Sequence, residues 1–187
     1  MFFKFFISDA PFSLPTAGTY VGFENYEAGI FKIGFFQAFG YSAFITVFSV
    51  LAIVLFTSML AWYITRVKGT LTKVIYYVLV FSMIVPFQMV MFTMSKIANM
   101  LRLDNPVGLI VIYLGFGAGL SSFMFSGFIK SIPLALEEAA MIDGANPIQT
   151  FFLVVLPMLK PTAITVAILN TMWIWNDYLL PYLTIGT

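Results

Sequence analysis

The sequence predicts an all-α, polytopic transmembrane helix bundle, and two observations lead to that fold class. Of the 187 residues, 61% are hydrophobic and only 9% are charged, whereas a soluble domain carries about 25% charged residues. A soluble fold of this size could not bury so much apolar surface, so the surplus must face lipid. The second observation is a series of long runs without any charged residue, which define the individual spans.

A helix needs roughly 20 apolar residues to cross the hydrocarbon core of a bilayer. The uncharged runs predict three spans, at residues 36–65, 74–95 and 106–129. The second span contains Pro86, which should kink its helix because proline removes a backbone donor. A fourth span is predicted at 161–181, where Pro161 suits the first turn of a helix.

Residues 1–35 are predicted to form a separate extracytoplasmic or interfacial segment, and 36–187 a partial transmembrane domain. Lys4 and Asp9 interrupt the aromatic N-terminus, so it lacks the apolar stretch of a signal peptide. Aromatic side chains suit the headgroup level of a bilayer. Those expected there are Phe23, Tyr26, Phe31 and Phe35.

The orientation follows from the turn after the first span, which holds Arg66, Lys68 and Lys73 without an acidic residue. Positive residues favour the cytoplasmic side, so this turn is predicted to lie inside the cell. Alternation of the spans then places 96–104 outside and 130–160 inside. We call residues 130–160 the inner loop.

Composition also excludes several classes of function. The net charge of +1 gives no electrostatic argument for nucleic acid. The chain has no histidine and no cysteine, so imidazole bases, thiol nucleophiles and the usual zinc sites are excluded. Gly115, Gly117 and Gly119 lie within an uncharged run and precede no Lys-Ser or Lys-Thr pair. They are expected to allow close helix packing rather than nucleotide binding.

The inner loop is predicted to form a helix–turn–helix element. Pro133 can open a helix that Asp143-Gly144 ends, because glycine takes the left-handed position after a helix most easily. Asn146-Pro147 should begin a second helix, with Gln149 placed for a capping box. This second helix is expected to end before Pro157.

The chemistry of the first of these helices allows two interpretations. Glu137 and Glu138 are followed by Ala139 and Ala140, and small residues permit close approach by a partner while a carboxylate pairs with an arginine. On the other interpretation the segment is an amphipathic surface helix whose glutamates are only solvated. Physical reasoning from the residues leaves both open.

The spacing in this loop resembles a known family. Glu138-Ala139-Ala140, three residues, Gly144, nine residues and then Val154-Val155-Leu156-Pro157 resembles the EAA loop of binding-protein-dependent ABC importer permeases. Val154 stands where the family pattern has isoleucine. The string Leu-Glu-Glu-Ala-Ala-Met-Ile-Asp-Gly-Ala at 136–145 is similar to the carbohydrate-uptake branch. Trp175-Asn176-Asp177 followed by Pro181 resembles the maltose-type second permease, the MalG-like half of a heterodimer.

This resemblance implies a multi-pass subunit of an ATP-driven sugar importer in the bacterial inner membrane, and not an enzyme. The implied partners are a cytoplasmic ABC ATPase dimer that holds ATP and Mg²⁺, a second permease subunit and an extracytoplasmic solute-binding protein. No cofactor is expected on this chain. Members of the family usually have six spans, so the chain is expected to be a fragment that lacks the first and the last.

In the family the EAA loop carries the coupling helix, which sits in a cleft of the ATPase subunit. Glu138 is expected to make the polar contact there and Gly144 to form the turn. Carried over to this sequence, the residues of the docking site are Glu137, Glu138, Ala139, Ala140, Asp143, Gly144, Ala145 and Pro157.

Polar residues at membrane depth are rare and usually face a cavity or a partner. The candidates for a translocation path are Gln88, Asn170, Asn176 and Asp177. Trp173 and Trp175 are expected either to stack on a sugar or to anchor the chain at the lipid interface. The alternatives are a permease for a polyol or glycerol phosphate, and a secondary transporter, which would have only Asp177 as an intramembrane charge.

Overall fold

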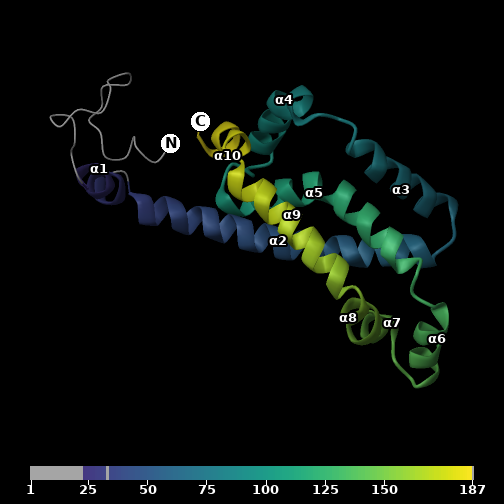
Figure 1. Ribbon diagram of the computed structural model, residues 1–187. Coiled ribbons are helices and arrows are strands. Elements are labelled where there is room, and N and C mark those ends of the chain that lie inside the picture. Colours follow the sequence, from purple (N-terminus) through teal and green to yellow (C-terminus); the bar gives the residue numbers. More distant parts are fainter. Residues whose placement is uncertain (1–22, 33, 187) are drawn as a thin grey trace, which may run out of the picture. The chain divides into compact units, whose positions relative to one another are not determined.

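The computed structural model describes residues 23–32 and 34–186, and every regular element in this part of the chain is helical (Figure 1). Most of the predicted interfacial segment, residues 1–22, therefore lies outside the described residues. The chain divides into two compact units, Met1–Ala43 and Phe44–Thr187. Each unit is considered by itself.

The described part of the first unit contains two short helical turns and the beginning of a long helix. The turns are α1 (Glu24–Glu27) and the π-helical turn η3 (Ala28–Lys32). Gly34 follows with a φ of +69°, a left-handed conformation that glycine adopts without steric cost. Of the aromatic side chains expected at the headgroup level, Phe23, Phe31 and Phe35 are exposed and Tyr26 is half-buried.

Two of the predicted spans are continuous helices. They are α2 (Phe35–Arg66), with 32 residues, and α5 (Pro106–Ile129), with 24 residues, and both are long and apolar enough to cross a membrane. The start of α5 is fixed by Asn105, whose side-chain Oδ1 accepts a hydrogen bond from the Gly108 N–H at 2.9 Å. Asparagine at this position satisfies one of the N–H groups that a helix leaves open at its start. The boundaries predicted from the uncharged runs are thus confirmed.

The second predicted span, 74–95, is not one continuous helix. It consists of α3 (Thr70–Ser82) and α4 (Phe87–Met100), which meet at an angle of 110°. At 1.5 Å per residue each is about 20 Å long, too short to cross a hydrocarbon core of about 30 Å. Pro86 has no N–H, and its ring keeps the preceding residue out of the helical conformation. The predicted kink is therefore a full break, and the two helices pass the test for a span only as a pair.

The inner loop forms the predicted helix–turn–helix element. It contains α6 (Leu134–Ile142), α7 (Pro147–Thr150), the π-helical turn η4 (Phe151–Val155) and α8 (Leu156–Met158). Gly144 has a φ of +91°. Asn146 and Gln149 exchange two hydrogen bonds of 2.9 Å, which is the expected capping box.

One prediction for this loop is wrong: the second helical segment does not end before Pro157 but runs through it to Met158. The π-helical turn η4 lies just before Pro157, and in it the Leu156 N–H donates a hydrogen bond to the carbonyl of Phe151. Local π-turns are one way in which a helix accommodates an irregularity such as proline.

The fourth predicted span, 161–181, is likewise divided. Helix α9 (Lys160–Asn176) has Pro161 in its first turn, as expected, and ends where α10 (Leu179–Ile185) begins. Asp177 lies between them in an extended conformation, and its Oδ1 accepts hydrogen bonds from the N–H groups of Leu179 at 3.0 Å and Leu180 at 3.3 Å. Aspartate side chains compete in this way with the backbone of a helix, so Asp177 ends α9 and starts α10. The segment Pro147–Met158 and α9 form the second bent pair, at 76°.

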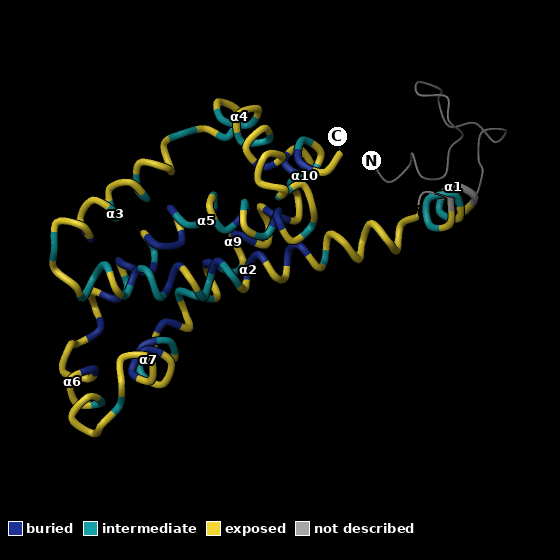
Figure 2. Tube along the Cα trace, turned by 180° about the vertical axis from the view of Figure 1, so that it is seen from behind, coloured by how far each residue is buried: buried dark blue, intermediate teal, exposed yellow. Residues whose placement is uncertain are grey.

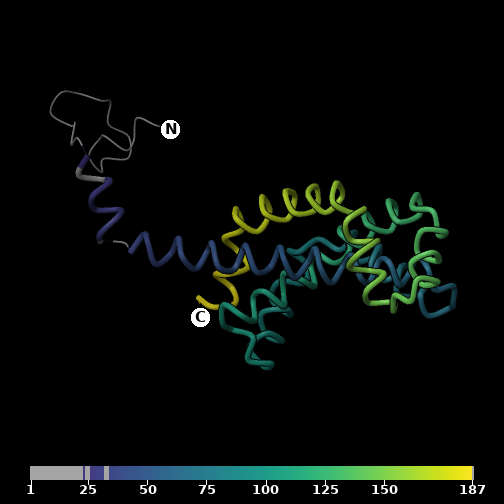
Figure 3. The backbone as a smooth tube through the Cα atoms, turned by 90° about the horizontal axis from the view of Figure 1, so that it is seen from below, coloured from purple at the N-terminus to yellow at the C-terminus, as the bar shows by residue number. Residues whose placement is uncertain are grey.

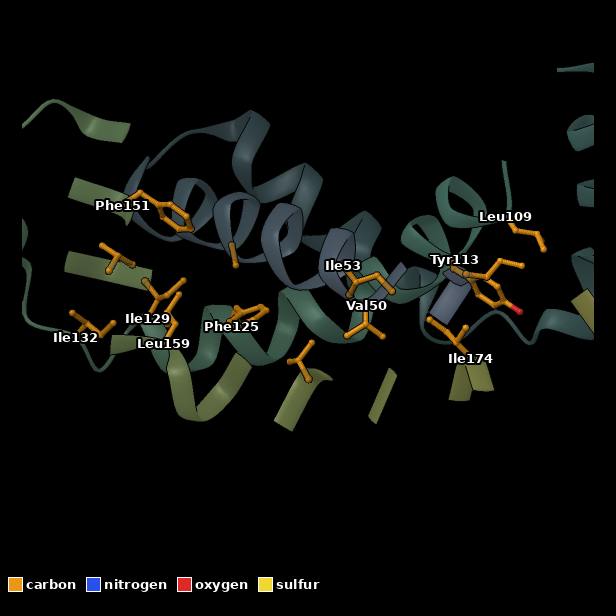
Figure 4. Packing of buried hydrophobic residues seen from close by; sticks show 14 of the residues in the cluster. Val50, Ile53, Leu109, Tyr113, Phe125, Ile129, Ile132, Phe151, Leu159 and Ile174 are labelled. Atoms are coloured by element: carbon orange, nitrogen blue, oxygen red, sulfur yellow. The ribbon is translucent and has the colours of Figure 1, made fainter. Parts of the chain in front are cut away.

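The core of the second unit lies around α5, with α2, α3 and α9 beside it. The buried side chains come mainly from α2, α5, η4 and α9 and gather along α5 (Figure 4), whereas the outward faces of the helices are exposed (Figure 2). The expectation of close helix packing is confirmed for Gly117 and Gly119. A Cβ atom at Gly117 would lie 2.7 Å from Ile53, and one at Gly119 would lie 2.7 Å from Ser82. At Gly115 nothing lies within 4 Å.

Helix α9 runs from the inner loop at one end of this unit to α10 at the other (Figure 3). At that second end α10 packs on α4, and the Ser95 hydroxyl donates a hydrogen bond of 2.5 Å to the carbonyl of Leu183. One end of the unit is thus formed by the inner loop and the α2–α3 turn. The opposite end is formed by α4 and α10.

Candidate functional site

The inner loop is attached to the end of α2 by a charged pair. Arg66, the last residue of α2, donates hydrogen bonds from Nε at 2.9 Å and from Nη2 at 2.6 Å to Oε1 of Glu137 in α6. Nη2 also donates to the carbonyl of Ile132 at 3.0 Å. The Glu137 side chain is only 1% exposed, and a carboxylate buried in this way requires such a partner. The pair therefore sets the position of α6 relative to α2.

Trp62, one turn before Arg66, completes this attachment. Its Nε1–H donates a hydrogen bond of 2.9 Å to the second carboxylate oxygen of Glu137. Its ring packs on Phe151, with centroids 5.5 Å apart. Phe151 is buried beside Ile129, Ile132 and Leu159 (Figure 4). Trp62 therefore contacts both α6 and η4, and it holds both segments of the inner loop against α2.

Glu137 and Glu138 are adjacent and were both predicted to belong to the docking site, but their side chains have different surroundings. The Glu137 carboxylate is fully occupied within the chain, whereas Glu138 is exposed. Of the other residues predicted to form the docking site, Ala139, Asp143, Gly144 and Pro157 are exposed, and Ala140 and Ala145 are half-buried. Pro157 lies in α8, where the chain returns towards α9, and the others lie on α6 and the turn after it.

The surface around Glu138 contains apolar residues that the sequence analysis did not select. In α6, Ile142 is 85% exposed and the adjacent Met141 is 45% exposed, and in α7 Ile148 is 66% exposed. Ile142 follows Glu138 by four residues and therefore shares its face of α6. Isolated exposed apolar residues are ordinary, but three within the α6–α7 element that also carries an exposed carboxylate form a surface that suits a partner protein. A search for apolar residues at i+4 from Glu138 would have found Ile142.

A cavity of about 320 Å³ lies beside the break between α3 and α4. Its walls include Ser82 and Phe87 on either side of the break, Gly117 of α5, and Asn170 and Trp173 of α9. Discontinuous membrane helices often border a translocation path, because their free backbone groups are tolerated only next to protein or water. Of the four polar residues predicted for such a path, Asn170 lines this cavity.

Asn170 is almost completely buried and makes specific contacts. Its Nδ2 donates hydrogen bonds to the Ser121 hydroxyl at 3.2 Å and to the carbonyl of Val166 at 2.8 Å. Its Oδ1 lies close to Gly117, since a Cβ atom there would be 3.0 Å away. Asn170 therefore joins α9 to α5 at the cavity wall.

The other predicted path residues do not line this cavity. Gln88 is exposed in the first turn of α4, and Asn176 is exposed and donates to the carbonyl of Met172 at 2.6 Å. Asp177 accepts a hydrogen bond of 3.1 Å from the hydroxyl of Tyr113 in α5, in addition to the two bonds that start α10. Its oxygens thus serve the packing of α5 against the α9–α10 break. Within residues 23–32 and 34–186, no three acidic side chains come close enough together to share a metal ion.

Comparison with known proteins shows the family to which this chain belongs. Residues 53–187 match the model of the family described as "binding-protein-dependent transport system inner membrane component". The chain belongs to this family. The prediction of a transport component rather than an enzyme is thereby confirmed, and so is its place as a multi-pass protein of the inner membrane.

Several curated relatives of this transport component are permease proteins of sugar systems. A probable starch degradation products transport system permease protein, AmyC, of Thermoanaerobacterium thermosulfurigenes is 41% identical over 87% of this chain and 60% of its own length. MsmG, the multiple sugar-binding transport system permease protein of Streptococcus mutans, is 39% identical over 78% and 53%. MelC, the melibiose/raffinose/stachyose import permease protein of Bacillus subtilis, is 34% identical over 84% and 58%. The chain thus spans a little over half the length of these relatives.

The fold also matches that of a solved protein. The crystal structure of a bacterial ABC transporter involved in the import of the acidic polysaccharide alginate superposes with a TM-score of 0.77. The match covers 99% of this chain and 70% of that chain, at 23% sequence identity. The all-helical transmembrane fold predicted from the sequence is therefore confirmed.

Proposed function

We propose that this chain is the membrane-spanning permease part of an ATP-driven importer that moves sugars delivered by an external binding protein. The observation that carries the proposal is the inner loop. Its outer face presents Glu138 and Ile142 to a partner, while its inner face is attached through Glu137 to a helix of the membrane domain.

The proposed partner on the cytoplasmic side is an ABC ATPase dimer, which would hold ATP and Mg²⁺. The exposed turn with Glu138, Ile142 and Gly144 would enter a cleft of that ATPase, with the carboxylate paired to an arginine and the isoleucine buried. A movement of the ATPase would then reach α2 through the Arg66–Glu137 pair. A ligand or nucleotide shifts such an equilibrium only through different affinities for the two states, and here ATP would supply that difference on the partner.

A sugar is the proposed substrate because of the cavity and the relatives. The cavity combines the side-chain oxygen of Asn170 with the aromatic faces of Phe87 and Trp173, and an acceptor oxygen and aromatic groups suit the hydroxyls and apolar faces of a sugar ring. The names of AmyC, MsmG and MelC indicate sugar systems. A second permease subunit would supply the other half of the path, and a solute-binding protein would deliver the substrate from outside.

Affinity purification from membranes in mild detergent, followed by mass spectrometry, tests the proposal. The wild-type protein should bring down a P-loop ATPase and a second multi-span permease. Glu138→Lys and Ile142→Asp should each reduce ATPase recovery by about tenfold or more, because a hot-spot residue of an interface contributes at least about 1.4–2 kcal/mol. Asp104→Asn, a change of charge in the turn at the opposite end of the unit, should leave recovery unchanged.

Recovery of the protein without an ATPase, or equal recovery with all three variants, would contradict the proposal. Uptake of a labelled oligosaccharide into vesicles that contain the complete complex would then test the substrate class. Uptake of glycerol phosphate or a polyol in its place would be consistent with an importer but would contradict the proposal that the substrate is a sugar.

A further inference from the structure

A second cavity lies at the end of the unit that carries the inner loop. It has a volume of about 580 Å³ and lies between the end of α2, the start of α3 and the end of α5. Figure 1 shows the α2–α3 turn at the same end of the unit as α6. Neither the sugar path nor the attachment of the inner loop uses this cavity.

Three lysines line this cavity: Lys68 and Lys73 from the α2–α3 region, and Lys130 from the end of α5. In the part of the chain that the structure describes, the one ion pair is that of Arg66 and Glu137, so none of these lysines has a carboxylate partner there. The Lys130 ammonium lies 5.8 Å above the ring of Tyr76, which also lines the cavity. A cation–π contact of this kind holds the charge at the cavity edge. Like charges around one cavity repel one another, so an anion between them would be stabilised.

The start of α3 adds to this positive field. The helix begins at Thr70 after Gly69, and both residues line the cavity. The N-terminal end of a helix carries a partial positive charge, which attracts anions within the first turn.

Apolar and aromatic side chains form another part of the cavity wall. Val67, just after α2, is 43% exposed, and Tyr77 of α3 is 69% exposed, and both line the cavity. A positively charged cavity with an exposed apolar wall matches a molecule with an anionic head and a hydrocarbon tail.

We propose that this cavity binds the phosphate headgroup of an anionic phospholipid of the inner leaflet, with an acyl chain against Val67 and Tyr77. The lysines Lys68, Lys73 and Lys130 would contact the phosphate. The proposal rests on the cytoplasmic orientation of the α2–α3 turn and is independent of the transported solute. Basic pockets between membrane helices at the cytoplasmic surface suit such headgroups, and free inorganic phosphate would leave the apolar wall formed by Val67 and Tyr77 without a role.

Lipid retention by the full chain tests the proposal. The protein is placed in nanodiscs of phosphatidylcholine and phosphatidylglycerol, repurified in mild detergent, and the retained lipids are counted by mass spectrometry. The preference for phosphatidylglycerol should fall at least about fivefold in the triple variant Lys68→Gln, Lys73→Gln, Lys130→Gln, because one lysine near an anionic surface contributes a factor of about five. Replacement of the same three lysines by arginine should preserve the preference.

A matched control removes the same number of charges elsewhere, through Lys96→Gln, Arg102→Gln and Lys160→Gln. It should retain the wild-type preference. An equal loss in the control, or no preference in the wild type, would overturn the proposal, because the effect would then depend on net charge alone or be absent.

Two further experiments identify the molecule that binds in the cavity. A photoreactive residue in place of Tyr77, which lines the cavity and is 69% exposed, should crosslink to phosphatidylglycerol. Crosslinking to another subunit instead would overturn the lipid assignment. Displacement of phosphatidylglycerol by millimolar inorganic phosphate would also overturn it, since the site would then recognise the free anion.

Discussion

Arg66 and Glu137 are 71 residues apart in the sequence, yet Arg66 Nη2 lies 2.6 Å from Glu137 Oε1. The next residue, Glu138, points its carboxylate to the exposed surface. Two neighbouring glutamates therefore have opposite roles: one joins the inner loop to the membrane domain, and the other is available to a partner. This division gives a direct test of which side chain stabilises the fold.

Glu137→Ala should lower the free energy of unfolding by about 3 kcal/mol, because it leaves the Arg66 guanidinium without its buried partner. Glu138→Ala should change it by less than about 0.5 kcal/mol, as expected for an exposed side chain. Denaturant unfolding of both variants in the same detergent measures the difference. Equal stability of the two variants would show that the charged pair does not fix the loop.

Gly144→Ala should destabilise the turn after α6 by about 1–2 kcal/mol, because its φ of +91° is unfavourable for a residue with a Cβ atom. The change should also reduce uptake by the assembled complex while leaving membrane insertion intact. Gly127→Ala is the matched control, since nothing lies within 4 Å of the added Cβ atom. Thermal melting and vesicle uptake compare the two, and normal uptake with Gly144→Ala would remove this turn from the coupling mechanism.

Trp173 and Trp175 are two residues apart, but only Trp173 lines the cavity of about 320 Å³ beside the α3–α4 break. Trp173→Ala should raise the KM for sugar uptake about tenfold, since an aromatic face against a ligand contributes on the order of 1–1.5 kcal/mol. Trp175→Ala should leave the KM nearly unchanged. If both substitutions act equally, the tryptophans serve as interface anchors and the cavity is not the sugar path.

Asp177→Asn distinguishes the importer from a secondary transporter. Asparagine keeps the side-chain oxygen that caps α10 and removes the charge, so stability should change by only a few tenths of a kcal/mol. ATP-driven uptake should therefore persist at half or more of the wild-type rate. A secondary transporter would depend on Asp177 for ion coupling, so complete loss of uptake in a stably folded variant would favour that alternative.

The parts of the fold that the sequence predicted best are those that depend on local patterns. The spans at 36–65 and 106–129 follow from uncharged runs, the two ends of α6 follow from Pro133 and Gly144, and the start of α7 follows from the Asn146–Gln149 pair. The proline, glycine and capping-box signals act within one or two turns, and an uncharged run acts within its own span. They could therefore be recognised without knowing what lies nearby in space.

The breaks and the charged pair could not be predicted in the same way. Proline at residue 86 indicated a kink but not an angle of 110°, because that angle depends on how α4 packs against α10. The role of Glu137 depends on Arg66 and Trp62, which lie on another helix. Apolar composition alone also suggested a single helix through Asp177, whose side-chain hydrogen bonds to the backbone end it.

The attachment of the inner loop at the extreme end of α2 has a geometric consequence for transport. From residue 44 to Arg66 the helix is about 34 Å long at 1.5 Å per residue. Arg66 and Trp62 attach the inner loop at one end of this helix. If α2 tilts by about 5° about that end, its other end moves by roughly 3 Å. If the partner proposed above docks on the inner loop, a slight rotation of that partner would therefore displace the opposite end of α2 by about the width of a water molecule, on the other side of the bilayer.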